Sequence, residues 1–343
     1  MAKNRLARRR KRYTHQAHAH ALESIRRDGR TCGAIPVAVG PQAFLEAHAL
    51  ERIGEWNPAC WHHDILGFGI TWVDPSPTSI ALGIPTRFLP DIISALIPMS
   101  SPDELADSAD DGYVEVYGLP GLRYRTVGCT AILSVPGIPG RIEIPVASPE
   151  IWEKAVLIAK ASWDEGSVFF WDECPTDWHT AERAFTETWP RRYGIGNSYY
   201  RTSRLASDVL RRLPAICAPF AAHDMWFNSC SEDGYAIEFE WQNSGPPRKI
   251  LDLLLDRKDG LRVQLKTCWD EQPISHFYSD DCTYVDLVSD LGGRLDLRHL
   301  RYPQRLSNNT RPTVFDVVRQ HRLELERQYG YPSSEKFLSS SAM

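Results

Sequence analysis

Apolar residues in the first half of the chain follow two different periodicities. Helical spacing of apolar positions predicts three helices, at residues 42–54, 87–96 and 149–162. Proline near the start of the last two suits the first turn of a helix. Runs rich in β-branched residues, bounded by proline or glycine, predict five strands, at residues 67–73, 79–84, 113–117, 130–135 and 141–146.

The order strand, turn, strand, helix occurs twice among these elements. It runs over residues 67–96 and again over residues 130–162. Two units of the same order suggest a structural duplication of a hairpin and its helix. The competing interpretation is coincidence, because hairpins followed by helices are common in mixed proteins.

The second half of the chain has the clearest strand pattern. Residues 235–241, 249–255 and 261–268 alternate between apolar and polar positions, and the last two segments flank an Asp-Gly turn. This pattern predicts an antiparallel meander, which a strand at 283–288 joins. The other elements predicted here are a strand at 167–171 and helices at 180–188, 202–213 and 313–329.

These elements predict an α+β fold in which antiparallel strands in hairpins dominate and helices pack on them. We expect a flexible, disordered basic arm at residues 1–30 and a disordered tail at residues 339–343. Between them we expect two lobes, an N-terminal α+β lobe at 31–162 and a C-terminal lobe with the meander at 163–338.

Composition narrows the class of protein. Of the 343 residues, 43% are hydrophobic and 24% are charged, which is typical of a folded globular chain. No apolar run approaches the roughly 18 residues that span a bilayer, so no membrane association is expected. The basic N-terminus lacks the apolar stretch of a signal peptide, and the eight cysteines form no C-x-x-C pair. A cytoplasmic location is the expectation.

Charge is distributed unevenly. Residues 1–30 carry a net charge of +8, so the remaining chain carries −13 of the overall −5. The cluster formed by Arg8, Arg9, Arg10, Lys11 and Arg12 predicts contacts with nucleic acid, because such clusters neutralise phosphates. An acidic protein is another candidate partner for the arm. The competing interpretation is a solvated tail with no partner.

A second basic stretch, residues 183–212, interleaves arginine with aromatic residues. Aromatic rings stack on unpaired bases and arginines pair with phosphates. The candidate contacts here are Arg191, Arg192, Tyr199, Tyr200 and Arg201. The competing interpretation is that these arginines pair with acidic residues of the same chain.

The meander resembles the minimal metal site of the PD-(D/E)XK nucleases. Asp252, or alternatively Asp256, corresponds to the first acid, and Gln264 and Lys266 correspond to the second element; Asp252, Gln264 and Lys266 are the candidate catalytic residues. Asp252 and Glu238, or Glu240 in place of Glu238, would hold Mg²⁺ through oxygen ligands. The pattern departs from the family because no proline precedes the acid. The competing interpretation is an ordinary hairpin with alternating charged residues, which has the same residue pattern without a metal site.

The chain contains no P-loop, no dinucleotide-binding glycine motif and no nucleophile elbow. The sequence therefore predicts a nucleic-acid-associated protein, with nuclease-like, metal-dependent activity in the meander as an extension of that function. The alternative is a non-enzymatic protein-interaction module that uses acidic and basic surfaces. The residues leave open whether the chain is an enzyme.

Overall fold

The computed structural model describes residues 2–29, 33–56, 67–101, 114–192, 196–217, 224–231, 234–242, 248–270, 282–290, 292–300 and 314–332. Its helices are α1 (Ala2–Thr14), α2 (His18–Asp28), α3 (Pro41–Trp56), α4 (Leu89–Leu96), α6 (Pro149–Ala161), α7 (Phe170–Glu173), α8 (Thr180–Arg192), α9 (Gly196–Leu210), α10 (Leu213–Cys217), α11 (Arg248–Leu254) and α12 (Val314–Gln328), with 3₁₀ turns η3 (Gly67–Gly69) and η4 (Thr86–Phe88). Its strands are β1 (Trp72–Ser76), β2 (Ser79–Gly83), β3 (Met99–Ser100), β4 (Arg123–Val127), β5 (Thr130–Ser134), β6 (Arg141–Pro145), β7 (Val168–Phe169), β8 (Asp224–Ser231), β9 (Gly234–Gln242), β10 (Val263–Asp270), β11 (Cys282–Ser289) and β12 (Arg294–Leu300). The α+β class and the dominance of antiparallel pairs are confirmed.

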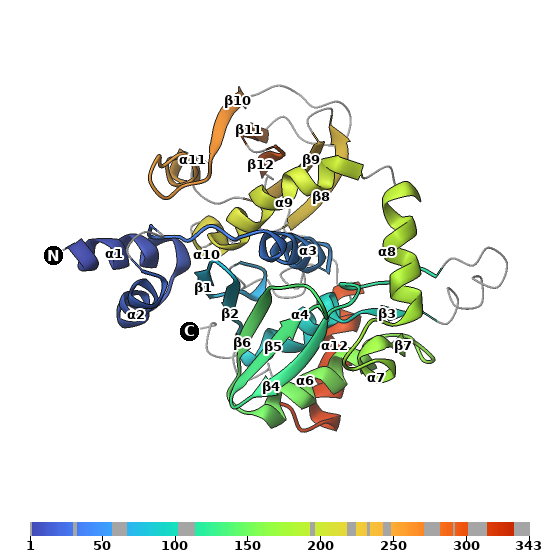
Figure 1. The fold of residues 1–343 in the computed structure, drawn as a ribbon. Coiled ribbons are helices and arrows are strands. Elements are labelled where there is room, and N and C mark those ends of the chain that lie inside the picture. The colour runs from blue at the N-terminus through green and yellow to red at the C-terminus, as the bar shows by residue number, and fades with distance from the viewer. Residues whose placement is uncertain are drawn as a thin grey trace.

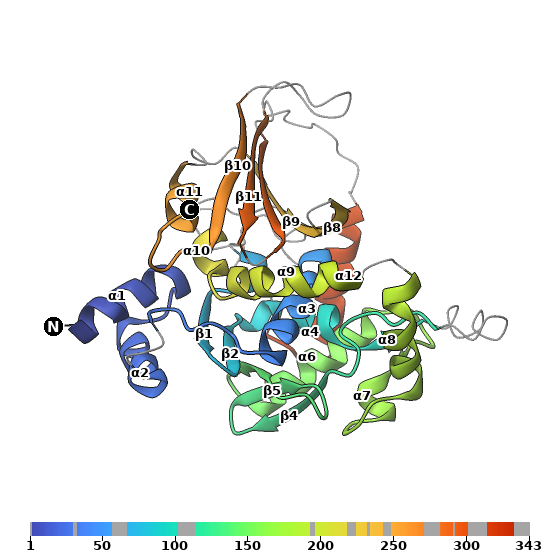
Figure 2. The same ribbon diagram turned by 45° about the horizontal axis from the view of Figure 1, so that its top comes forward.

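The first sheet has the strand order β1-β2-β6-β5-β4. All neighbours are antiparallel except β2 and β6, which are parallel. Aliphatic side chains such as Ile80, Leu133 and Ile142 alternate along the strands and are fully buried on one face. Helices α3, α4 and α6 cover this face (Figure 2).

Both predicted hairpin–helix units form, as β1-β2-α4 and β5-β6-α6. They meet through their second strands, β2 and β6, which run parallel. A rotation that superposes two such hairpins has its axis along the strands and would move one helix to the opposite face of the sheet. Because α4 and α6 pack against each other on a single face, the arrangement argues against duplication of this short unit alone.

The second sheet has the order β10-β11-β12-β9-β8. Again all neighbours are antiparallel except one pair, here β9 and β12. Its inward face carries aliphatic and aromatic residues such as Ile237, Phe239 and Leu297, which join the main core. The core is therefore continuous between the two sheets.

The two sheets share one topology, and it extends to the helices around them. In each, a helix precedes a hairpin, a second helix follows, and a three-stranded meander then returns its last strand parallel to the second strand of the hairpin. A final helix closes each set. We name the segment from α3 to α6 the first repeat and the segment from α9 to α12 the second repeat (Figure 1).

The opening helices of the repeats, α3 and α9, pack directly against each other. At this seam Glu46 of α3 accepts two hydrogen bonds from Arg211, which follows α9, at 2.6 and 2.7 Å. Both side chains are fully buried. The last helix, α12, reaches the first repeat, where Arg322 lies 3.6 Å from Asp91 of α4. The repeats are thus joined at two places.

The segment between the repeats packs on the first sheet. Arg123 at the start of β4 pairs with Glu182 of α8 at 2.6 Å, and both are buried. The Trp171 indole donates to the carbonyl of Leu122 at 2.7 Å. These contacts place α7 and α8 against the first sheet.

Several predicted elements differ from the structure. Residues 249–255, expected to be a strand of the meander, form helix α11, because Ile250, Leu253 and Leu254 are buried at helical spacing. The meander instead consists of β10, β11 and β12, and β9 belongs to a separate hairpin with β8. The strand predicted at 67–73 begins later, as β1 at Trp72–Ser76, and strand β4 was not predicted. The final helix at 313–329 is confirmed as α12.

Candidate nucleic-acid interface

The basic N-terminal segment is a pair of helices, not a flexible arm. Helices α1 and α2 pack against each other through the buried residues Ala7, Ala21 and Ile25. Alanine, leucine and arginine favour helix at most other positions. Short helices are marginal alone, so the contacts with the rest of the chain described below supply the support they need.

Arg10 is the most deeply placed basic residue of this segment, with a fully buried side chain. Its guanidinium donates to Asp74 at 2.7 Å, to Asp28 at 3.0 Å, to Gln16 at 2.9 Å and to the carbonyl of Pro75. A buried arginine is stable only when its donors are satisfied in this way. Arg10 is therefore inaccessible to a nucleic acid, and the prediction that it is a nucleic-acid contact is wrong.

Asp74 of β1 is the anchor for both helices of the segment. Arg27 of α2 also reaches it, at 3.0 Å. Burial acts to raise the pKa of Asp74, but the hydrogen bond from Arg27 and the charges of Arg10 and Arg27 outweigh it and lower that pKa. The ionised carboxylate therefore fastens α1 and α2 to the edge of the first sheet.

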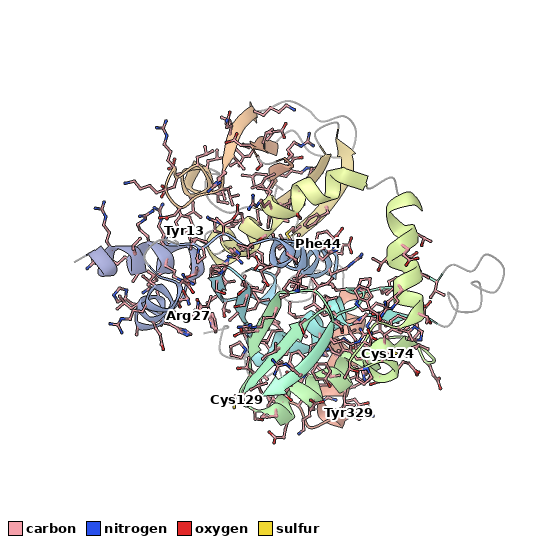
Figure 3. The ribbon with its side chains drawn as sticks, in the orientation of Figure 1. Tyr13, Arg27, Phe44, Cys129, Cys174 and Tyr329 are labelled. Carbon is pink, nitrogen blue, oxygen red and sulfur yellow. The ribbon has the colours of Figure 1, made fainter. Side chains whose placement is uncertain are left out.

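A second anchor joins α1 to the chain just after α11, in the second repeat. The Tyr13 hydroxyl donates to Asp256 at 3.0 Å, and Arg12 lies 3.6 Å from the same carboxylate. Arg9 pairs with Asp259 at 2.5 Å. Figures 1 and 3 show α1, with Tyr13 labelled, beside α11 and its following segment. The helix thus contacts both repeats.

The turn that receives α1 is tightly built. The backbone N–H of Lys258 donates to Asp256 at 3.0 Å, and this bond, with Tyr13 and the nearby arginines, lowers the pKa of Asp256. Gly260 lies so close to the chain that a Cβ there would stand 2.4 Å from the carbonyl oxygen of Leu254. The turn therefore holds its side chains in fixed positions next to α1.

A set of exposed cations surrounds this contact, and we name it the basic junction. Its members are Arg5, Arg8, Lys11 and Arg12 on α1, and Arg257, Lys258 and Arg262 after α11. Apart from Arg12, none forms an ion pair with a side chain that the structure describes. Arg5, Arg8 and Arg12 share one face of α1 by their spacing. The acidic residues nearest to them, Asp256 and Asp259, are already paired with Arg9 and Arg12.

The second predicted basic stretch, residues 183–212, is only partly described by the structure. Arg191 and Arg192 lie in α8, and Tyr199, Tyr200 and Arg201 lie in α9, but the side chains of all five are outside the described part of the structure. Two further arginines of the stretch, Arg211 and Arg212, are buried and paired with Glu46 and Asp208. For these two, the competing interpretation of internal pairing holds.

The residues of the predicted nuclease site lie on elements that do not form the expected pattern. Asp252 is exposed on helix α11, and Gln264 on the edge strand β10 donates to Asp290 at 2.8 Å. Lys266 falls at the irregularity in the pairing of β10 with β11. Glu238 lies on β9, with β11 and β12 between it and β10, which is a separation of about 14 Å.

Two observations bear on a metal at that site. Glu238 is buried and its carboxylate pairs with Arg298 at 2.6 Å. Within the described ranges, no group of three or more His, Cys, Asp or Glu side chains is arranged to hold a metal ion. The structure therefore does not bring Asp252 and Glu238 together as joint ligands with Gln264 and Lys266.

Comparisons with known proteins add no family to these observations. No protein-family model, no curated protein and no solved structure matches the chain. In the described part of the chain, no helix has the length and apolar character required to cross a membrane.

The sequence located the arm's charge but not its setting. It missed Arg257, Lys258 and Arg262, because they lie some 250 positions away from the arm. The usable signal was the pair Asp256 and Asp259, spaced to meet two successive turns of a basic helix. The sequence of an acidic turn does not indicate which distant basic helix it contacts, so this pairing becomes visible only in the fold.

Proposed function

We propose that this chain binds nucleic acid through the basic junction. The observation that supports the proposal is that the basic residues of α1 fall into two groups, one paired with the rest of the chain and one exposed to solvent. Arg9 and Arg10 are used to dock the helix, whereas Arg5, Arg8 and Lys11 are exposed and make no ion pair among the described side chains. Part of the positive charge of the N-terminal segment is therefore used in ion pairs with the rest of the chain, and the remaining cations stay exposed to solvent.

The arrangement suits the phosphate backbone of a nucleic acid. Exposed arginine and lysine side chains on a helix and an adjoining turn can neutralise several successive phosphates, and each contact releases condensed counterions. Because α1 is anchored at both Asp74 and Asp256, these cations are ordered before binding. Such contacts fix position rather than base sequence, so the proposal is for binding without strong sequence preference.

The rest of the chain limits where such binding occurs. Outside residues 1–30 the net charge is −13, which disfavours a polyanion over most of the surface. The proposal assigns binding only. It gives no catalytic step to Asp252, Gln264 or Lys266.

The experiment is a salt titration of binding to duplex and single-stranded DNA and RNA. A triple variant, Arg5→Gln, Arg8→Gln and Lys11→Gln, is compared with a matched triple at exposed arginines on β4, β6 and α12, namely Arg125→Gln, Arg141→Gln and Arg327→Gln. Each lost phosphate contact should lower the slope of log affinity against log salt by about 0.9. On duplex DNA we expect the first triple to lose about 2.7 from the slope and the second to match the wild type.

Equal salt dependence of the two triples, or no binding by the wild type at low salt, would contradict the proposal. The alternative of an acidic protein partner gives a distinct result. In that case an acidic polypeptide such as polyglutamate binds the wild type and not the first triple, while nucleic acid binds neither.

A further inference from the structure

The basic junction carries its exposed cations on two separate elements. The first row is on α1 and the second row is on the segment that follows α11; the members are Arg5, Arg8, Lys11 and Arg12 in the first row and Arg257, Lys258 and Arg262 in the second. The two elements are joined by the pair Arg9–Asp259 and by the hydrogen bond from Tyr13 to Asp256 at 3.0 Å. They therefore lie side by side, and each keeps its own cations exposed to solvent.

Aromatic side chains are almost absent from these two elements. Residues 2–28 and 248–266 contain a single Phe, Tyr or Trp, which is Tyr13. Its side chain is 1% exposed and its hydroxyl is bonded to Asp256. Proteins that bind single strands stack successive bases on exposed aromatic rings. Neither segment provides such a ring, so the phosphates are the part of a nucleic acid that the basic junction can contact.

The length of the first row corresponds to a short stretch of duplex. Arg5 and Arg12 are seven residues apart on α1, which is about 10 Å along a helix axis. Over about 10 Å a duplex presents about six phosphate charges, about three on each strand. The first row can therefore neutralise the phosphates of one strand over this length, and the second row those of the other. A single strand would leave one row without phosphates.

The position of the two rows also favours an extended polyanion. In the views of both Figure 1 and Figure 2, α1 extends outward from the body of the protein and α11 lies on the same side. The rows thus share one end of the molecule. A polyanion bound there stays away from most of the remaining surface, where the net charge outside residues 1–30 is −13.

We propose that the basic junction binds double-stranded nucleic acid, with one row of cations on each strand. This inference rests on the proposed function and specifies its ligand. Asp256 and Asp259 hold α1 against the segment after α11, so the spacing between the rows is set before the ligand arrives. A duplex also keeps its two phosphate strands at a fixed spacing, so both partners are preorganised for this contact.

The test measures the affinity of the full-length protein for a short DNA duplex and for one of its strands alone, with an RNA duplex and its strand measured in the same way. We expect the wild type to bind a duplex at least about tenfold more tightly than the single strand at equal salt. The variant Arg257→Gln, Lys258→Gln and Arg262→Gln removes the second row. On duplex DNA it should lose about 2.7 from the slope of log affinity against log salt. Its affinity for the single strand should change little, because one strand occupies only the first row.

Two controls accompany this variant. The triple Arg125→Gln, Arg141→Gln and Arg327→Gln should keep the duplex preference of the wild type. The charge-retaining triple Arg257→Lys, Lys258→Arg and Arg262→Lys should keep the slope, and circular dichroism verifies that each variant folds.

The outcomes separate this inference from the proposed function. If the wild type binds no nucleic acid at low salt, both fail. If the wild type binds single strands as tightly as duplexes, or if loss of the second row leaves the duplex preference unchanged, this inference is overturned and the proposed function stands.

Discussion

The two repeats have the same strand order and the same inward pattern, yet their outward faces differ. Inward positions in both sheets are aliphatic or aromatic, as in Ile142 of β6 and Leu297 of β12. Outward, the first sheet combines Ala81, Glu143 and Ile132 in one row, whereas the second has Glu238, Asp296 and Asp286. Packing against the core determines the inward residues in both repeats, so the two sheets differ mainly in their outward residues.

The N-terminal helix α1 contacts both repeats. Helix α1 meets the first repeat at Asp74 and the second at Asp256 and Asp259. Helix α1 therefore links the two repeats, and we call it, together with α2, the strap. The exposed cations of the basic junction lie beside its contact with the second repeat. Two related halves acquire a shared surface that neither has alone.

The largest expected effect tests whether the repeats form one cooperative unit. Arg211→Ala removes the cationic partner of Glu46 at the seam and leaves a buried carboxylate with hydrogen bonds only from Gln42 and Ser207, which costs about 3–5 kcal/mol. Chemical denaturation measures the free energy of unfolding. Arg204→Ala, at an exposed arginine on α9, is the control and should stay within about 0.5 kcal/mol. A loss below about 1 kcal/mol at Arg211 would show that the seam does not couple the repeats.

A smaller effect is expected at the edge of the first sheet. A Cβ at Gly83 would lie 2.1 Å from Nε1 of Trp72, its cross-strand neighbour. Gly83→Ala should therefore displace the indole, which also contacts the His20 ring of α2, and destabilise the protein by about 1–3 kcal/mol. Thermal unfolding measures it, with Ala81→Ser as the control. An unchanged melting temperature would contradict the close packing of β1 and β2.

The strap should release at low pH. The pKa values of Asp74 and Asp256 are lowered in the fold, so their contribution to docking is fully present above the ordinary aspartate pKa and is lost as pH falls through the folded values. Hydrogen exchange of α1 and α2, corrected for intrinsic rates, should accelerate about tenfold or more at pH 3 relative to pH 7, equivalent to about 1.4 kcal/mol. Exchange in α3 serves as the reference. Equal acceleration in α3 and α1 would indicate global unfolding instead.

The smallest effect compares Asp286 with Glu143, on the outward faces of the two sheets. Asp286→Asn removes an unsatisfied buried charge and should raise the free energy of unfolding by about 1 kcal/mol. Glu143→Gln removes one member of a surface ion pair and should change it by less than about 0.5 kcal/mol. Urea denaturation distinguishes them. Destabilisation by Asp286→Asn would show that its carboxylate is already satisfied.

Local periodicity predicted the elements whose pattern is strong and whose burial is one-sided. The final helix, the helix at 42–54 and the strand pair at 130–146 follow from it. It failed where a short apolar run fits both periods, as at Ile250, Leu253 and Leu254, because only contacts from other elements choose between helix and strand there. For the candidate interface, it supplied Arg8 and Lys11 but not Arg257, Lys258 and Arg262.

The sequence by itself determined the α+β class, the two hairpins of the first sheet and the concentration of positive charge at the N-terminus. These depend on residues close together in the chain. Only the tertiary structure decided that Arg10 is buried while Arg8 is exposed, that Asp256 meets Tyr13, and that Glu238, Asp296 and Asp286 form one row. Such pairings join residues up to about 240 positions apart, and local propensity carries no information about which distant strand or turn becomes a neighbour.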